Sequence, residues 1–438
     1  MAVEPGADAI PDAPLMAEAA GVPYPLGAAT PPVTKRRRRV TTVRVLMMMA
    51  ALGLVGGGAL YSQKDAVAPE VADAGRRIVG DENWARVESV YFRAEDRADK
   101  LKYRIFGAEA DPFALAVHIE WVPRPEAKTH PYYVGIIPPS SPLPTMDAFA
   151  SPPLRLPKTT PLRDTPEPGE GVWTTAGLPR SSPNDVLMAK TFIRPDRSRP
   201  YASVGILLLD SRRMMLNMVG GTVDPGGDRG VKGPGVIPAH DHPRLLVAWN
   251  GGFKGPHGGY GMTVEGREFR PMRNGLATIC TYKDASIRIG EWGVDLTATD
   301  QVSSCRQNAV LLVKDGQVSK RTAEGNDTWG YVQVNSAEFI TWRSAVGVTQ
   351  DGSLLVATGN SLSAATLAQA LWAAGAHSAM QLDINNPYVL LGQFYQQPDG
   401  ALKHEKFMDS MPDSPSRFLK TQERDFMYVT LDESRWTR

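Results

Sequence analysis

Proline is concentrated in two segments of this chain, and this limits where a folded domain can lie. Of the 36 prolines in 438 residues, seven fall in residues 1–32 and thirteen in residues 123–168. Proline interrupts helix interiors and the centres of sheets, so neither segment favours long regular elements. The regular structure must therefore come mainly from the rest of the chain.

The charge balance excludes some classes of protein. The chain carries 48 Lys and Arg against 47 Asp and Glu, a formal net charge of +1. A nucleic-acid binder usually shows a strong basic excess, so we expect no nucleic-acid partner. With 42% hydrophobic residues, the chain can also build a sizeable core.

The N-terminal region predicts a membrane anchor. Residues 1–44 are rich in Ala, Pro and Gly and end in a basic run, so we expect a disordered cytoplasmic tail. Residues 45–62 are uncharged and nearly long enough to span a bilayer. The positive-inside rule would then place residues 63–438 outside the cytoplasm, in the periplasm or the extracellular space. A cleaved signal peptide and a twin-arginine export signal are weaker alternatives, because no clear cleavage site or twin-arginine continuation follows.

The rest of the chain divides into three parts. Residues 63–122 are charged and helical in pattern, which predicts either a stalk or a helix packed on the main domain. Residues 123–168 predict a proline-rich connector. Residues 169–438 predict an α+β fold, a mixed β-sheet domain with packed helices.

Several strands are predicted in this domain. Residues 203–209 and 214–219 read as a hairpin around a four-residue turn. Further on, a strand at 353–358, a helix ending near Ala374 and a strand at 379–382 form a strand–helix–strand unit. That unit places Asp383 at the end of its second strand.

The only two cysteines are Cys280 and Cys305. In an exported domain they could form a disulfide, which would contribute about 3 kcal/mol for a loop of this length. The alternative is a pair of buried free thiols. Their spacing does not suggest a zinc site.

Polar and glycine-rich segments follow two of the apolar runs. One is the stretch at 250–261, NGGFKGPHGGYG, and the other begins at Asp383. Glycines let the backbone approach a ligand closely, although a long turn would explain them equally well. There is no GK[ST] motif, so a nucleotide P-loop is not expected.

Residues 200–432 resemble the phosphodiester glycosidase family. Four stretches carry the resemblance in the right order: NGGF at 250–253, RQN at 306–308 followed by VKDG at 313–316, RSAVGV at 343–348, and Leu382-Asp383. The resemblance implies a hydrolase that cleaves a sugar from a phosphodiester without a redox cofactor. It leaves residues 1–165 unexplained.

The chemistry implied by the resemblance needs a carboxylate at the anomeric centre, a cation for the phosphate and amides for the sugar hydroxyls. Asp383, Arg343 and Asn250 match the family motifs and fit these roles, and His257 is a further catalytic candidate. The general acid is undecided among His257, Glu265, Glu268 and Asp327. The predicted substrate-binding residues are Asn250, Gly251, Gly252, Gln307, Asn308 and Asn385.

The chain departs from the family after the aspartate. The family's GGGS is here Ile384-Asn385-Asn386-Pro387, which predicts a narrower pocket. Asn385 could instead supply hydrogen bonds or an oxygen ligand for a hard cation such as Ca²⁺, although no motif indicates one. The predicted function is thus a membrane-anchored hydrolase of a glycosyl phosphodiester in cell-envelope polymers. The alternatives are a non-catalytic envelope-glycan binder and a structural envelope protein.

Overall fold

The computed structural model describes residues 68–107, 112–113, 154–179, 186–330, 339–397, 400–411 and 413–432. The chain divides into two compact units, Met1–Ser62 and Gln63–Arg438, and all described residues belong to the second. The predicted tail and anchor, residues 1–44 and 45–62, lie outside the described residues. Of the helices in the described ranges, none combines the length and the apolar character needed to cross a membrane.

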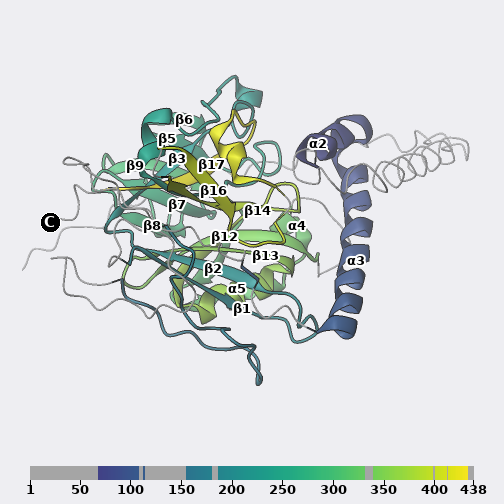
Figure 1. Ribbon diagram of the computed structural model, residues 1–438. Coiled ribbons are helices and arrows are strands. Elements are labelled where there is room, and N and C mark those ends of the chain that lie inside the picture. Colours follow the sequence, from purple (N-terminus) through teal and green to yellow (C-terminus); the bar gives the residue numbers. More distant parts are fainter. Residues whose placement is uncertain are drawn as a thin grey trace, which may run out of the picture. The chain divides into compact units, whose positions relative to one another are not determined.

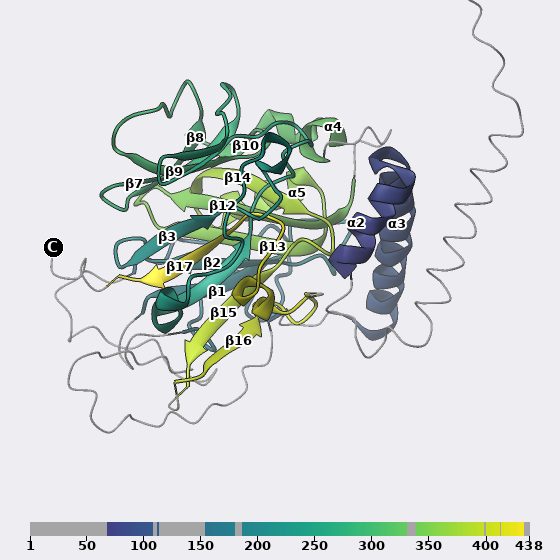
Figure 2. The same ribbon diagram turned by 90° about the horizontal axis from the view of Figure 1, so that it is seen from above.

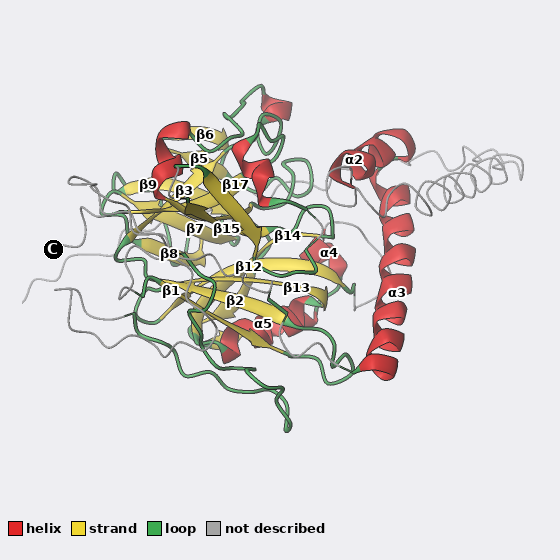
Figure 3. Ribbon diagram, in the orientation of Figure 1, coloured by secondary structure: helices red, strands yellow, loops and turns green. Residues whose placement is uncertain are grey.

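Three sheets form the framework of the described structure (Figure 3). The largest has seven strands in the order β1 (Met188–Ile193), β2 (Val204–Leu209), β13 (Leu354–Leu362), β12 (Thr341–Thr349), β14 (Ala376–Ile384), β10 (Leu311–Lys314) and β11 (Gln317–Val318). A five-stranded sheet has the order β16 (Leu402–Lys406), β15 (Leu391–Gln396), β4 (Leu245–Asn250), β17 (Phe426–Leu431) and β3 (Met214–Val219). The third sheet has the order β6 (Arg267–Arg270), β5 (Met262–Val264), β9 (Val302–Gln307), β7 (Ala277–Tyr282) and β8 (Ile287–Glu291).

Neighbouring strands in these sheets are antiparallel wherever the structure describes a strand pair. Helices are few. They are α2 (Ala68–Val79), α3 (Asp81–Phe106), α4 (Asn326–Gly330) and α5 (Ala364–Ala373), with short 3₁₀ turns at η1 (Gly227–Arg229), η2 (Ala239–Arg244), η3 (Lys320–Ala323) and η4 (Pro415–Leu419). The mixed sheet-and-helix domain predicted from the sequence is thus present, with several antiparallel sheets rather than one.

The centre of the seven-stranded sheet is covered on both faces, which explains why most positions of its central strands are buried. In β2, Leu207 and Leu209 belong to the core shared with β4 of the five-stranded sheet. The alternate residues Ile206 and Leu208 belong to a second core, which they share with α5. Side chains alternate between the two faces of a strand, so every position in β2 is buried. Figure 2 shows α5 beside this sheet.

The predicted strand–helix–strand unit is β13, α5 and β14. Ser363 caps α5 by accepting a hydrogen bond from the Thr366 backbone N–H at 3.2 Å. Strands β13 and β14 both pair antiparallel with β12, which lies between them. They therefore run in the same direction, and Asp383 is the second-last residue of β14.

The predicted hairpin of residues 203–209 and 214–219 is wrong. Both strands exist, but β2 belongs to the seven-stranded sheet and β3 to the five-stranded sheet. Both edges of β2 are already paired, with β1 and β13, so the chain must leave the sheet after Leu209. Asp210 fixes this turn by accepting from Arg212 Nε at 2.8 Å and Arg213 Nε at 2.9 Å.

The charged segment before the connector forms two helices, α2 and α3, that meet at Gly80 with φ 82°. Within the described residues, α3 contacts the sheet domain. Phe92 of α3 lies edge-on to Phe339, and Asp96 accepts from Arg199 Nε at 3.0 Å and from the Tyr201 hydroxyl at 2.7 Å. Figure 1 shows α3 alongside the sheet domain.

Cys280 and Cys305 face each other on the neighbouring strands β7 and β9. They are joined by the disulfide that their spacing allows, with both side chains buried. The bond ties the third sheet together at the strand that carries the RQN motif.

Candidate active site

The candidate site forms where the ends of three strands meet. Strand β4 ends at Asn250, β14 ends just after Asp383, and β17 begins at Phe426. The Asp383 backbone N–H donates to the Gly251 carbonyl at 2.9 Å, which joins the end of β14 to the end of β4. Asn250 Nδ2 donates to Ser344 Oγ, and Ser344 Oγ donates to the Asp383 carbonyl, both at 2.8 Å. The structure thus brings Asn250 and Asp383 together.

A buried ion pair explains the glycines of the NGGF segment. Arg306 and Asp425 form a two-pronged pair, with Nε–Oδ2 at 2.8 Å and Nη2–Oδ1 at 3.0 Å, and neither side chain is more than 1% exposed. A Cβ on Gly251 would lie 2.0 Å from Asp425 Oδ2, and one on Gly252 would lie 2.9 Å from Arg306 Cζ. The glycines are therefore needed to pack against this pair, although Gly251 also lines a pocket.

Gln307 and Asn308 are fully buried and support the loops around the site. Asn308 Nδ2 donates to the carbonyls of Gln381 and Leu382, and its Oδ1 accepts from the Phe253 N–H at 3.1 Å. Gln307 Oε1 accepts from the backbone N–H groups of Gly261 and Arg273. Neither residue lines the pockets described below, so their predicted substrate contacts have no support in this geometry.

Arg343 lies in a different environment from the one its predicted phosphate-binding role requires. Its side chain is 1% exposed and donates to the carbonyls of Leu362, Trp329 and Phe339 and to Gln381 Oε1. Because acceptors of the protein surround the guanidinium, it is not presented to a ligand. We therefore assign Arg343 a structural role in β12.

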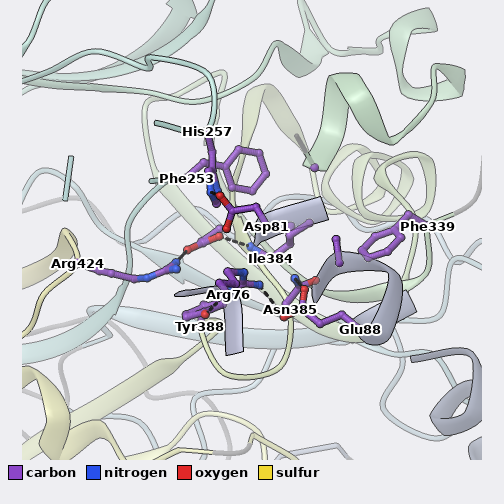
Figure 4. A pocket seen from close by; sticks show the side chains of 13 residues that line it. Arg76, Asp81, Glu88, Phe253, His257, Phe339, Ile384, Asn385, Tyr388 and Arg424 are labelled. Atoms are coloured by element: carbon purple, nitrogen blue, oxygen red, sulfur yellow. Dashed lines mark hydrogen bonds and ion pairs between the residues drawn. The ribbon is translucent and has the colours of Figure 1, made fainter. Parts of the chain in front are cut away.

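A pocket opens beside Asp383, with α2 and α3 on one wall and the strand ends on the other (Figure 4). A second, adjoining pocket shares Asp383, Tyr388 and Arg424 with it. The first pocket is lined by Arg76, Asp81, Ala85, Glu88, Phe253, His257, Gly330, Phe339, Asp383, Ile384, Asn385, Tyr388 and Arg424. Asn250 and Gly251 line the second. Asp383 is thus the predicted residue common to both.

Asp383 carries the carboxylate at the centre of the site. Its Oδ2 pairs with Arg424 Nη1, and its Oδ1 accepts from the Ile384 N–H at 2.9 Å. Burial raises the pKa of Asp383 above its ordinary value, while Arg424 and the Ile384 N–H oppose that rise. Burial also disfavours the Arg424 cation, but Asp383, Tyr388 and Asp73 outweigh it and raise the pKa of Arg424.

His257 lines the same pocket and lies beside Asp81 of α3 (Figure 4). Its Nε2 is 3.6 Å from Asp81 Oδ2. Burial lowers the pKa of His257 to about 4; Arg424, Lys254 and Arg76 also lower it, and Asp81 acts in the other direction. The imidazole is therefore neutral at pH 7. It can accept a proton from a ligand or donate a hydrogen bond through its N–H.

The departure after Asp383 has a conformational explanation. Asn385 has φ 78°, a left-handed conformation that glycine and asparagine adopt more readily than other residues. Its Oδ1 accepts from Thr341 Oγ1 at 3.0 Å, and its Nδ2 donates to Glu88 Oε2 of α3 at 3.4 Å. Asparagine thus keeps the turn that glycine would allow, and its side chain adds a contact with α3. In the described part of the chain, no group of three or more His, Cys, Asp or Glu side chains is placed to hold a metal ion.

The sequence patterns did not single out Lys254, Tyr388 and Arg424, nor Asp73, Arg76 and Asp81 of the two helices. Lys254 falls inside the glycine-rich stretch at 250–261 and Tyr388 follows Asp383 by five residues, but none of the six has a pattern of its own. The signal available was the pair Arg424-Asp425 directly before the apolar strand β17, since charged residues at a strand end often face a site. Glu265 and Glu268, considered as general acids, are exposed at the β5–β6 turn, away from both pockets.

Comparison with known proteins confirms the family resemblance. Residues 244–383 match the family model described as phosphodiester glycosidase. A search of curated proteins finds no match.

Two solved structures are similar over 57% of this chain. One is the zebrafish N-acetylglucosamine-1-phosphodiester alpha-N-acetylglucosaminidase catalytic domain auto-inhibited by pro-peptide, at 16% identity, 85% coverage of that chain and a TM-score of 0.34. The other is a hypothetical protein from Synechocystis, at 12% identity, 63% coverage of that chain and a TM-score of 0.35. These two similarities carry no conclusion about activity.

Proposed function

We propose that this protein is a membrane-anchored hydrolase that cleaves a glycosyl phosphodiester. The observation that carries the proposal is the pairing of Asp383 with Arg424 in a pocket at the strand ends of a phosphodiester glycosidase domain. A carboxylate beside a guanidinium supplies two of the groups that the reaction needs. The carboxylate acts at the anomeric carbon, and the guanidinium binds phosphate oxygens.

In the proposed reaction, the bond between the anomeric carbon and the phosphate oxygen breaks, and water supplies the oxygen that joins the anomeric carbon. The products are a free sugar and a phosphomonoester. Asp383 acts as the carboxylate at the anomeric carbon, and Arg424 takes the phosphate-binding role predicted for Arg343. His257, neutral at pH 7, lies on the same pocket and is placed to exchange a proton with the substrate or with water.

The location of the protein is part of the proposal. The basic run before residue 45 and the uncharged residues 45–62 support a single-pass anchor with the domain outside the cytoplasm. The Cys280–Cys305 disulfide is consistent with an oxidising compartment. A phosphodiester-linked sugar of a cell-envelope polymer is therefore the proposed substrate class.

The activity is tested on the full chain in detergent with a panel of chromogenic sugar-1-phosphodiesters. We expect turnover by the wild type and a loss of at least about a thousandfold in kcat/KM for Asp383→Asn. Asp164→Asn is the matched control, because the Asp164 side chain is 94% exposed and lines neither pocket. Its activity should stay within a few fold of wild type.

A second candidate function is glycan binding without hydrolysis. It is favoured by the Asp383–Arg424 pair, which holds the carboxylate on a protein cation, and by the Ile384–Pro387 departure. Binding of a sugar phosphodiester with no turnover would support this candidate and overturn hydrolysis. Equal turnover by wild type and Asp383→Asn would overturn the assigned role of Asp383.

A further inference from the structure

Helix α2 places one carboxylate against a group of cations that the sheet domain supplies. Asp73 Oδ1 accepts from Lys254 Nζ and from the Tyr388 hydroxyl, both at 2.8 Å. Arg424 Nη2 lies 3.8 Å from the same oxygen, and Arg76 Nη1 of α2 lies at 3.4 Å. Burial works to raise the pKa of Asp73, but Arg424, Lys254 and Tyr388 outweigh it and keep the carboxyl ionised. One carboxylate oxygen therefore accepts hydrogen bonds from Lys254, Tyr388 and Arg76 and lies within ion-pair distance of Arg424.

Three of these donors come from segments that are far apart in the sequence. Lys254 follows the NGGF segment after β4, Tyr388 follows the Asp383 turn after β14, and Arg424 precedes β17. They converge on one point only because the strand ends meet there. The donor set thus belongs to the sheet domain, and α2 contributes the anion that fills it.

Arg424 still has a donor available for another ligand. Among the described residues, its buried Nε has no hydrogen-bond partner. Its guanidinium lies over the Tyr388 ring, 3.5 Å from the centroid, and pairs with Asp383. Only the Arg424 side chain therefore separates the donors around Asp73 from Asp383, the proposed catalytic carboxylate. A phosphate and the anomeric carbon to which it is linked are expected to be neighbours in this way.

We propose that Lys254, Tyr388 and Arg424 form a phosphate subsite, and that Asp73 of α2 occupies it until a phosphate group displaces its carboxylate. This assignment rests on the proposed hydrolysis of a glycosyl phosphodiester, whose phosphate is a monoanion like the carboxylate. Both anions accept hydrogen bonds from ammonium, hydroxyl and guanidinium groups. The adjoining pocket, which Asp73, Tyr388 and Arg424 line together, gives the phosphate a route to the subsite.

Displacing Asp73 does not require α3 to leave the domain. Asp96 of α3 is held by Arg199 and Tyr201, and Phe92 is packed on Phe339. Arg76 is also tied to Glu88 of α3 at 2.6 Å. A local change at α2 is therefore enough to clear the subsite. With an internal competitor of this kind, the apparent dissociation constant is the intrinsic one divided by the fraction of time for which the site is free.

The test measures binding of inorganic phosphate and of dimethyl phosphate to the full chain by titration calorimetry. Asp73→Asn removes the competing charge at constant shape, and we expect both anions to bind about tenfold more tightly or better. The matched control is Asp81→Asn, which removes a carboxylate from α3 that faces His257 rather than the subsite. It should change affinity by less than about twofold. Adding Lys254→Met to Asp73→Asn should abolish the gain.

Two results would overturn the subsite. One is an Asp73→Asn variant that unfolds at the wild-type temperature but binds the two anions no more tightly than the wild type does. The other is an equal gain from Asp81→Asn, which would indicate a general charge effect. Tighter binding of inorganic phosphate alone would assign the site to a free phosphate or monoester and would overturn the diester assignment.

The calorimetry does not depend on turnover, so the two proposals fail separately. If Asp73→Asn binds dimethyl phosphate as expected but no sugar phosphodiester is hydrolysed, the subsite holds and the proposed function fails. If hydrolysis occurs but neither anion responds to Asp73→Asn or Lys254→Met, the function holds and the subsite fails.

Discussion

Two arginines near the same strand ends, Arg306 and Arg424, are held in opposite ways. Arg306 is closed off: its partner Asp425 and backbone carbonyls take its donors, and neither partner is more than 1% exposed. Arg424 is 19% exposed, lines both pockets and meets Asp383, Asp73 and Tyr388. The sealed pair fixes the loops, whereas the open cluster keeps groups that a ligand can use. Burial alone therefore does not identify the functional arginine; the partners do.

The largest expected difference between these regions is in stability. Arg306→Met leaves Asp425 buried without its partner, and we expect unfolding to become easier by about 3–5 kcal/mol. Arg424→Met should cost no more than about 2 kcal/mol, because Asp73 keeps Lys254 and Arg76 while Asp383 can take up a proton. Chemical denaturation of both variants measures the difference. Similar losses in the two variants would remove the distinction between a sealed pair and an open cluster.

A smaller effect is expected where the NGGF segment packs against the sealed pair. Gly251→Ala places a Cβ 2.0 Å from Asp425 Oδ2 and 2.7 Å from the Asp425 carbonyl, so the backbone must shift. We expect a loss of about 1–3 kcal/mol in the free energy of unfolding. Gly227→Ala is the matched control, because its Cβ would have no neighbour closer than 3.5 Å. A harmless Gly251→Ala would show that the ion pair does not require the glycine.

The smallest expected effect concerns the pH dependence of the packing of α3 against the sheet domain. Burial, followed by the nearby Asp99, raises the pKa of Glu95 to about 7, although a hydrogen bond from Asn360 opposes the rise. The docked Glu95 therefore binds a proton that the undocked side chain releases near pH 4.5. The contribution of Glu95 to the docking of α3 is therefore present in full below that pH and is lost as the pH rises through about 7. Asp96, Asp99, Lys102 and Arg199 are the other charged groups near this contact.

Hydrogen exchange of the α3 amides between pH 5 and 8 measures this weakening after correction for intrinsic rates. We expect a fall in protection of about tenfold or less, because Glu95 is only partly buried and solvent screens its charge. Glu95→Gln should flatten the profile, and Glu82→Gln, at a side chain that is 83% exposed, should not. An unchanged slope in Glu95→Gln would assign the pH dependence to another group.

The sequence identified Asp383, the proposed reacting carboxylate, because local patterns place it. An apolar run predicts the strand, the capped helix before it fixes the crossover, and the family motif marks Asp383 at the strand's end. The paired cysteines and the apolar alternation of the strands are likewise local features. The sequence also predicted helices in the segment before the connector, although not which of two roles they have.

Other features depended on the packing of distant segments. Residues 203–219 have the pattern of a hairpin, but the pairing of β2 on both edges forces β3 into another sheet. Arg343 fits a family motif, yet its neighbours in space surround it with carbonyls. Lys254, Tyr388 and Arg424 have no shared spacing, so no pattern predicts that they meet at Asp73.

The sequence by itself indicated the family resemblance, the strand that carries Asp383 near its end and the two cysteines that could pair. Each of these depends on residues that are close in the chain or on a motif with a fixed order. Only the tertiary structure decided which arginine faces the pocket and which carboxylate fills the cation cluster beside it. Electrostatic partners are chosen by distance in space, and here those distances are set by three strand ends and a helix that lie up to 351 residues apart.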